Sequence, residues 1–315
     1  MKKRILVVGG SGLLGHKILE KKNSRFEMFG TYFSNPFSME NVEIIKLNIS
    51  DKKSCKKISE FKPDIIVNTT ALTNVDFCEK FEEEAFNVNV LGTRNLAKIA
   101  NQIGSKFIHI STDNVFSGKK RKYSENDIQE PVNVYGQTKL KSETEAALVS
   151  DYTVLRTCVL FGVVPFNLTK NRSDSIKPMN FAMWVLTKIA NNELLRIVKD
   201  QINTPTLADN LADVIIKISN KKLSGIFHAS GLTCISRYEF TKKIVKIFGF
   251  SDKNIIPTVT KDLNQFALRP LQTCLNCDKI IKEGINLLDL DESIEIMYKQ
   301  IKKYDLSFFQ NSEHF

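Results

Sequence analysis

A glycine-rich turn near the N-terminus limits the fold of this chain more than any other feature. Residues 9–15 read Gly-Gly-Ser-Gly-Leu-Leu-Gly, and they follow an apolar run of β-forming residues at 4–8. Glycine lets the backbone turn tightly and approach a pyrophosphate, while the first N–H groups of the following helix bind the phosphate oxygens. The turn therefore predicts a dinucleotide-binding βαβ unit whose cofactor contacts are Gly9, Gly12, Leu13, Leu14 and Gly15.

Apolar β-forming runs alternate with amphipathic stretches of helical length through the first half of the chain. Strands are predicted at 4–8, 26–32, 42–47, 64–68, 106–112 and 152–156, and helices near 13–22, 51–60, 79–103 and 135–149. This alternation is typical of βαβ units around a parallel sheet. We therefore predict an α/β protein with a Rossmann-like, doubly wound parallel sheet.

The pattern loosens after residue 157. Residues 162–178 are rich in Asn, Ser, Lys and Pro, a helix is predicted near 179–191, and short mixed elements follow. We predict a dinucleotide-binding Rossmann domain over 1–157 and a smaller C-terminal α/β substrate lobe over 158–315, with some segments returning to the Rossmann domain. The length of 162–178 favours a functional loop, and the tail 307–315 is predicted to be loosely held.

Charge and hydropathy exclude several classes of protein. The 315 residues include 45 Lys and Arg against 35 Asp and Glu, for a net charge of +10. The basic residues are scattered and lack interleaved aromatic residues, so we predict no nucleic-acid partner. No apolar run approaches the roughly 18 residues that span a bilayer, so we predict no membrane partner.

The six cysteines favour a reducing compartment. They fall mostly within predicted strands and helices, so they suggest no disulfide framework, and we predict a cytoplasmic protein. Cys274 and Cys277 form one Cys-x-x-Cys pair, but a zinc site needs further soft ligands and the histidines show no ligand spacing. We therefore predict no metal.

The residues after the second and third strands bear on cofactor choice. The segment 31–35 holds no Asp or Glu to bind the adenosine ribose, whereas Ser34 is able to donate to a 2′-phosphate. This favours NADP(H), with NAD(H) as the alternative. Asn48 follows the third strand, where it either binds the adenine edge or serves as a turn residue.

A tyrosine and a lysine share one face of the helix predicted at 135–149. Tyr135 and Lys139 are spaced i, i+4, and Thr112 ends the strand before that helix. An ammonium beside a phenol lowers the phenol pKa, and a neighbouring hydroxyl helps to hold a carbonyl oxygen. The three residues therefore predict carbonyl/alcohol chemistry with Tyr135 exchanging the proton.

The chain resembles the extended short-chain dehydrogenase/reductase superfamily, and within it the dTDP-4-dehydrorhamnose reductase family, over nearly its whole length. Besides the glycine turn, the resemblance rests on Asn68-Thr69-Thr70-Ala71, Val88-Asn89-Val90-Leu91-Gly92-Thr93, Ser111-Thr112-Asp113-Asn114-Val115-Phe116, Tyr135-Gly136-Gln137-Thr138-Lys139 and Arg269-Pro270. No single later motif is specific, but their order and spacing together are.

The resemblance implies NAD(P)H-dependent reduction of the 4-keto group of a nucleotide-linked 6-deoxy sugar, for polysaccharide synthesis. It implies that Thr112 binds the keto oxygen, that Tyr135 supplies the proton and that Lys139 holds the nicotinamide ribose. Further cofactor contacts are expected for Asn48, Ile49, Thr70, Ala71, Asn89 and Tyr135, with Asn48 in a place where the family often has an acidic residue. Substrate contacts are implied for Thr112, Asn114, Asn180, Gln201 and Arg269.

Three departures from the family pattern keep alternatives open. Asn114 stands where the family usually has a tyrosine, and Val159 stands where it commonly has a tryptophan beside the sugar. These changes leave the identity of the sugar open, so another nucleotide-sugar reductase or epimerase is the enzymatic alternative. Lys17 lies where members with a magnesium-bridged dimer carry glutamate, so the metal is not carried over, while a homodimer stays open. The non-enzymatic alternative is a regulatory subunit like the β subunit of methionine adenosyltransferase.

Overall fold

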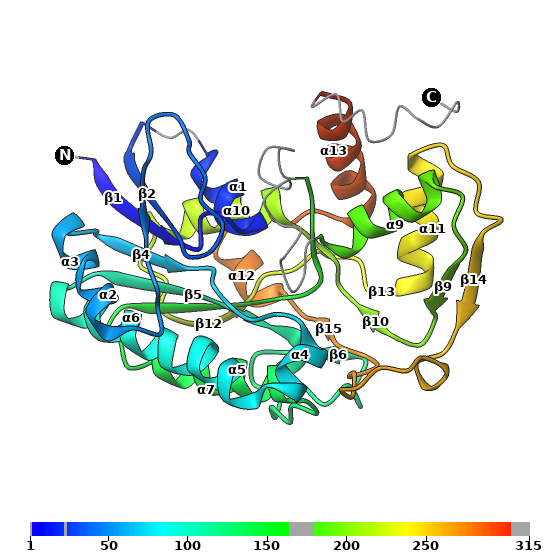
Figure 1. The fold of residues 1–315 in the computed structure, drawn as a ribbon, viewed down its shortest axis with the longest axis horizontal. Helices are drawn as coiled ribbons and strands as arrows, with labels where there is room; N and C mark the ends of the chain where they lie inside the picture. The colour runs from blue at the N-terminus through cyan, green and yellow to red at the C-terminus, as the bar shows by residue number, and fades with distance from the viewer. Residues whose placement is uncertain (1, 22–23, 164–178, 304–315) are drawn as a thin grey trace.

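A seven-stranded parallel sheet forms the centre of the molecule. The computed structural model describes residues 2–21, 24–163 and 179–303 (Figure 1). The strand order is β12-β7-β5-β4-β1-β2-β3, and each neighbouring pair is parallel. The strands are β1 (Lys3–Val8), β2 (Phe26–Tyr32), β3 (Glu43–Lys46), β4 (Ile65–Asn68), β5 (Lys106–Thr112), β7 (Tyr152–Thr157) and β12 (Gly225–His228). The predicted Rossmann-like sheet is confirmed.

The central strands are buried on both faces, which explains their continuous apolar sequence. Along β1, Ile5 and Val7 point into one core, while Leu6 and Val8 point into the other. Because all seven strands are parallel, their carboxyl ends lie along one edge of the sheet. Ligands of such sheets bind outside this edge, so the loops that follow β1, β4 and β5 are the natural place for a site.

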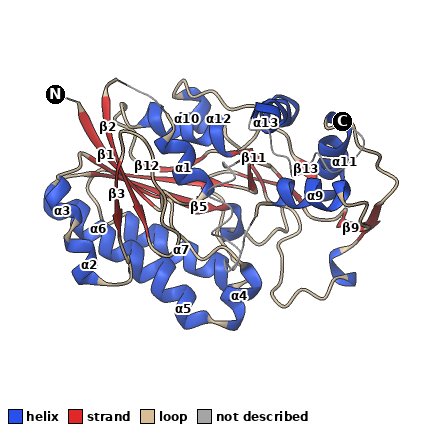
Figure 2. Cartoon of the chain, turned by 45° about the horizontal axis from the view of Figure 1, so that its top comes forward, coloured by secondary structure: helices blue, strands red, loops and turns tan. Residues whose placement is uncertain are grey.

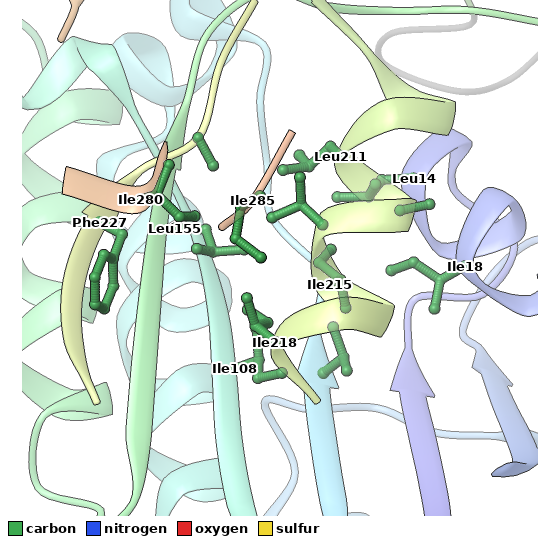
Figure 3. Packing of buried hydrophobic residues seen from close by; sticks show 14 of the residues in the cluster. Leu14, Ile18, Ile108, Leu155, Leu211, Ile215, Ile218, Phe227, Ile280 and Ile285 are labelled. Atoms are coloured by element: carbon green, nitrogen blue, oxygen red, sulfur yellow. The ribbon is translucent and has the colours of Figure 1, made fainter. Parts of the chain in front are cut away.

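Helices cover both faces of the sheet. One face packs on α1 (Leu13–Leu19), α10 (Ala208–Ile218) and α12 (Asp278–Lys282), whose apolar side chains meet in the core of Figure 3. The other face packs on α2 (Lys52–Lys56), α3 (Ile58–Phe61), α6 (Gly92–Ile103) and α7 (Val134–Ala146) (Figure 2). The sheet is therefore doubly wound, as predicted.

The helix predicted over 79–103 is wrong as a single element. The structure has α4 (Val75–Lys80), α5 (Glu82–Phe86), a π-helical turn η1 (Asn87–Leu91) and then α6. Phe81 breaks the first helix because its backbone leaves the helical region, with φ −128° and ψ 63°. Local periodicity did not show this break, since both sides of it are helical. The helix predicted near 51–60 is likewise divided, into α2 and α3.

A smaller group of elements with its own core lies beyond the sheet (Figure 2). It contains α9 (Phe181–Ala190), β9 (Leu195–Val198), α11 (Arg237–Ile247), β14 (Ile255–Thr258) and α13 (Leu290–Lys303). Short pieces join it to the sheet: β6 (Lys122–Tyr123), β8 (Leu160–Phe161), β10 (Ile202–Asn203), β11 (Thr206–Leu207), β13 (Ile235–Ser236), β15 (Cys274–Leu275), η2 (Asp113–Val115) and η4 (Thr260–Asp262). The division of the chain at residue 157 stays a prediction.

A disulfide joins Cys234 to Cys274, with the Cα atoms 5.6 Å apart. The cysteine positions suggested no disulfide framework, and the structure corrects this expectation for one pair. The two residues are 40 positions apart in sequence, and only the packing of β10 against both β13 and β15 brings them together. Cys277, the sequence neighbour of Cys274 in the Cys-x-x-Cys pair, is a free, buried thiol.

Lys17 is fully covered between α1 and α10. Its ammonium forms ion pairs with Glu20 at 3.3 Å and with Asp209 at 3.2 Å. The predicted functional loop falls, from residue 164 onward, outside the described residues, as does the predicted loose tail. No helix in the described part of the chain is long and apolar enough to cross a membrane.

Candidate active site

The glycine turn joins β1 to α1 at the carboxyl edge of the sheet. The Gly12 N–H donates to the Gly9 carbonyl at 2.9 Å, and Gly9 has a left-handed φ of 92°. A Cβ on Gly15 would collide with the Gly9 carbonyl oxygen, so only glycine packs there. Gly12 is the N-cap of α1 and has no side chain to accept from the first-turn N–H groups. Those groups, from Leu13, Leu14 and Gly15, fit the pyrophosphate of a dinucleotide.

The residues predicted near the adenosine follow β2 and β3. Ser34 is exposed just beyond β2, and its hydroxyl accepts from the Asn35 amide at 3.4 Å. The Asn48 side-chain oxygen accepts from the Ser50 N–H at 3.0 Å, which is an Asx turn. Ile49 is buried. Ser34 therefore presents an open hydroxyl, whereas the Asn48 oxygen is used within its own turn.

The loop after β4 carries Thr70 and Ala71, which are both half-buried. Asn89, in η1, is buried, and its side-chain oxygen accepts from the Leu72 N–H at 2.8 Å. Its amide nitrogen donates to the Leu72 carbonyl at 3.2 Å and to the Thr138 hydroxyl at 3.0 Å. Asn89 therefore fastens this loop to α7, and its polar atoms bind protein groups.

Thr112 and Tyr135 meet at the carboxyl end of β5. Thr112 is the last residue of that strand, and Tyr135 lies in the first turn of α7. Asn133 caps this helix by accepting from the Gly136 N–H at 2.8 Å. The lack of a side chain on Gly136 lets the turn pack directly on the Asn114 carbonyl. As a result, the Tyr135 hydroxyl lies near that of Thr112, which acts to lower the pKa of the phenol.

The pKa of Tyr135 differs from the expectation. Burial raises this pKa above its ordinary value, and the hydrogen bond with Thr112 offsets only part of the increase. The negative charge of Asp113 raises the pKa further, and Lys139 is not among the groups that shift it. The expectation that Lys139 lowers the pKa of Tyr135 is therefore wrong for this structure. The phenol is protonated at neutral pH, which is the form that donates a proton.

Lys139 lies one helical turn beyond Tyr135 and is buried. Its ammonium donates to the Ile110 carbonyl at 2.7 Å and lies 3.2 Å from His109 Nε2. Burial lowers the pKa of Lys139 to about 8, and Glu143 acts in the opposite direction. Burial and the Lys139 charge also keep the pKa of His109 well below its ordinary value. The lysine therefore changes its charge close to physiological pH, beside a neutral imidazole.

A buried ion pair supports the helix that carries Tyr135. Arg156 donates through Nε and Nη2 to the two carboxylate oxygens of Glu143, at 2.9 and 2.7 Å. The Ser111 hydroxyl donates to the same carboxylate at 2.5 Å. The side chains of Arg156 and Glu143 are only 1% and 3% exposed. Because these residues come from β7, α7 and β5, the ion pair holds α7 against two strands.

Two predicted substrate residues use their amides within the protein. Asn114 donates to the Thr112 hydroxyl at 3.4 Å and to the Asp113 carboxylate at 3.1 Å. Asn180 is the N-cap of α9, and its amide donates to the Gly162 carbonyl at 2.8 Å. Asn114 thus contacts the Thr112 hydroxyl directly, whereas Asn180 ties α9 to the segment after β8.

The other two predicted substrate residues lie on loops between the sheet and the smaller core. The Gln201 amide donates to the Thr260 hydroxyl at 3.2 Å. Arg269 donates to the Ala267 carbonyl at 2.8 Å and pairs with Asp76 of α4 at 3.0 Å. Since α4 packs against α7, this ion pair brings Arg269 to the helix that carries Tyr135.

The structure adds Asp113 and Cys158 to the polar groups around Thr112 and Tyr135. The Cys158 thiol donates to the Asp113 carboxylate at 2.9 Å, and the Thr273 hydroxyl donates to the same oxygen. Val159 follows with a left-handed φ of 40°, which is strained for a β-branched residue. The Ser-Thr-Asp run was a signal for Asp113. No local signal marked Cys158 or Thr273, because only the tertiary fold brings them to this carboxylate.

Comparison with known proteins assigns the chain to a family. The family model described as "RmlD substrate binding domain" matches residues 2–303. The chain belongs to this family. The resemblance predicted from the motifs is thereby confirmed.

Three known proteins are similar to this chain. The dTDP-4-dehydrorhamnose reductase of Aggregatibacter actinomycetemcomitans is 33% identical over 296 residues, covering 88% of this chain and 92% of the relative. The methionine adenosyltransferase 2 subunit beta of Danio rerio is 31% identical over 297 residues, covering 90% and 86%. The crystal structure of dTDP-4-dehydrorhamnose reductase from Bacillus anthracis in complex with NADP has a TM-score of 0.83 at 27% identity, covering 95% of this chain and 100% of that one.

Proposed function

We propose that this chain catalyses the NAD(P)H-dependent reduction of the 4-keto group of a nucleotide-linked 6-deoxy sugar, in the synthesis of polysaccharide precursors. The observation that carries the proposal is the grouping of Thr112, Tyr135 and Lys139 at the sheet edge that also holds the glycine turn. The reductase relative from Aggregatibacter actinomycetemcomitans supports the same reaction. A proton donor beside a dinucleotide cradle is what reduction of a carbonyl requires.

In the proposed mechanism the chain binds the ketone and supplies the proton. A bound nicotinamide would provide the hydride for the carbonyl carbon. Tyr135 then transfers its phenolic proton to the carbonyl oxygen, while the neighbouring Thr112 hydroxyl holds that oxygen in place. Lys139 would bind the nicotinamide ribose through its ammonium group.

The test is a direct assay of reduction. The purified chain is mixed with NADPH and dTDP-4-dehydro-6-deoxyhexose, and oxidation of the nicotinamide is followed at 340 nm. Sugar-dependent oxidation supports the proposal. NADPH binding without reduction of any 4-keto nucleotide sugar would remove it.

The open hydroxyl of Ser34 leads to a prediction about the cofactor. No carboxylate lies in 31–35, so we expect NADPH to bind about tenfold more tightly than NADH, the effect of one hydrogen bond to a charged phosphate. Ser34→Ala should weaken NADPH binding and leave NADH binding unchanged. Fluorescence titration measures both constants. Equal affinities in the unchanged chain would contradict the preference.

The lowered pKa of Lys139 leads to a prediction about pH. The ammonium loses its proton as the pH rises through about 8, so kcat/KM should fall above that pH, approaching tenfold per pH unit. In Lys139→Arg the side chain stays charged, and whatever activity remains should not decline between pH 8 and 9.5. Initial rates across this range test the assignment. The same decline in both proteins would show that another group titrates.

A regulatory role is the second candidate, because a methionine adenosyltransferase β subunit is 31% identical to this chain. In that case the cofactor site would serve binding rather than turnover. A pull-down that recovers a stoichiometric enzyme partner, together with no reduction of any keto sugar, would favour this role.

We infer a cytoplasmic enzyme whose partner is its nucleotide-sugar substrate, with a homodimer as the alternative to a monomer. Fractionation of cells and light scattering of the purified chain test these two points.

A further inference from the structure

Arg237 joins three segments beside Asp113, and no sequence motif indicated this residue. It is the first residue of α11, and its N–H donates to the Gln201 carbonyl at 3.0 Å. Its guanidinium carbon lies 4.7 Å from the centre of the Phe181 ring, at the start of α9. An arginine stacked on an aromatic face has a defined orientation, because its planar group has few other positions that keep the contact.

The groups that act on Arg237 show what it faces. Burial lowers its pKa, the neighbouring Cys158 and Asp113 raise it, and the like charge of Arg269 lowers it. The guanidinium stays positive at every physiological pH. It therefore lies with a second arginine on the side of the site where Asp113 follows Thr112.

The neighbouring carboxylates are already engaged. Asp113 accepts from Cys158 and from the hydroxyl and amide groups around it. Asp76 pairs with Arg269. Both oxygens of Asp200, beside Gln201, accept from the Thr260 N–H. Among the residues that the structure describes, no carboxylate comes within ion-pair distance of Arg237. A partly buried cation without a carboxylate partner calls for an anion from outside the chain.

Arg269, whose positive charge acts on Arg237, lies close to the reacting groups. Asn133 caps the helix of Tyr135, and its amide donates to the Leu268 carbonyl at 2.9 Å, next to Arg269. In a 4-keto nucleotide sugar the diphosphate is attached to C1, across the ring from the reacting C4. In the orientation that we propose, the C4 oxygen meets Thr112 and the diphosphate extends toward the smaller core, where Arg237 begins α11.

We propose that Arg237 binds the diphosphate of the nucleotide-linked substrate, with Phe181 holding its guanidinium plane. This inference rests on the proposed function. A guanidinium presents its N–H groups as a fork that matches phosphate oxygens, and such charge-assisted hydrogen bonds are about twice as strong as neutral ones. Arg237 then accounts for affinity toward the diphosphate, which all nucleoside diphosphate sugars have in common. Recognition of the base and of the sugar depends on other residues.

The experiment measures nucleotide binding without turnover. Calorimetry of the full chain with saturating NADPH uses dTDP, UDP and GDP as probes, and the corresponding nucleosides as uncharged comparisons. For the tightest diphosphate we expect Arg237→Gln to weaken binding about 10- to 100-fold and Arg237→Lys to weaken it less. Arg196→Gln is the matched control, because Arg196 is exposed on β9 of the same core and its loss should change binding less than twofold.

Each outcome decides the assignment. If Arg237→Gln folds and binds the diphosphate as tightly as the wild type does, the assignment of Arg237 is overturned. The assignment is also overturned if the wild type binds no nucleoside diphosphate more tightly than the corresponding nucleoside. If Arg237→Gln does not fold, Arg237→Lys decides, since unchanged affinity there excludes fork recognition. Arg237-dependent diphosphate binding without keto-sugar reduction would support this inference and remove the proposed reductase activity, so the two failures are distinguishable.

Discussion

Replacing Tyr135 with phenylalanine is expected to lower turnover by about 10²- to 10⁴-fold, the usual contribution of a positioned acid. The phenylalanine keeps the ring but lacks the hydroxyl that Thr112 bonds, so the carbonyl oxygen loses its proton donor. Binding of NADPH should change little, because the glycine turn is untouched. Steady-state rates and a cofactor titration measure the two effects separately.

A matched control for this variant lies in the same structure. Tyr123 is a buried tyrosine of β6 whose hydroxyl accepts from the Lys120 N–H at 2.9 Å. Tyr123→Phe removes a hydroxyl of the same kind that lies on β6 and not on α7, and turnover should stay near that of the wild type. Near-wild-type turnover in Tyr135→Phe would show that another group supplies the proton.

Replacing Glu143 with glutamine is expected to lower the free energy of unfolding by about 3–5 kcal/mol, the cost of leaving a buried charge without its partner. Arg156 is 1% exposed, so water does not replace the lost carboxylate. Its cationic group also faces the Phe116 ring at 5.2 Å, which is a much weaker partner. Urea denaturation of the two proteins gives the difference directly.

Glu145→Gln provides the control on the same helix. Glu145 pairs with Arg94 at 2.6 Å, but the Arg94 side chain is 40% exposed, so the loss should be below about 1 kcal/mol. Similar losses for both substitutions would mean that the Glu143 ion pair is solvated in solution. A double variant, Glu143→Met with Arg156→Met, should recover part of the stability because no unpaired charge remains.

Much of the fold follows from local patterns in the chain. The alternation of β-forming runs with helical stretches predicted the first six strands to within two residues, since strands buried on both faces must be continuously apolar. The glycine turn predicted its own geometry, because a Cβ on Gly15 meets the Gly9 carbonyl. The spacing of Tyr135 and Lys139 likewise predicted their shared helix face.

The partners of polar groups were not predictable in the same way. Asn89 and Asn180 were expected to bind ligands, but their amides hold Leu72 and Gly162. An amide binds a backbone group as readily as a ligand, and sequence does not say which one lies within reach. Lys139 was expected to act on Tyr135, whereas its ammonium is held by the Ile110 carbonyl.

The sequence by itself determined the parallel sheet, the glycine turn and the three residues proposed for catalysis, because those features depend on neighbours close along the chain. Only the tertiary structure decided the Cys234–Cys274 disulfide, the identity of β12 as the later segment that returns to the sheet, and the place of Arg237 on Phe181. These features depend on contacts between segments that are distant in sequence. The tertiary structure also decides burial, which shifts the pKa values of Tyr135 and Lys139 because water is excluded from them.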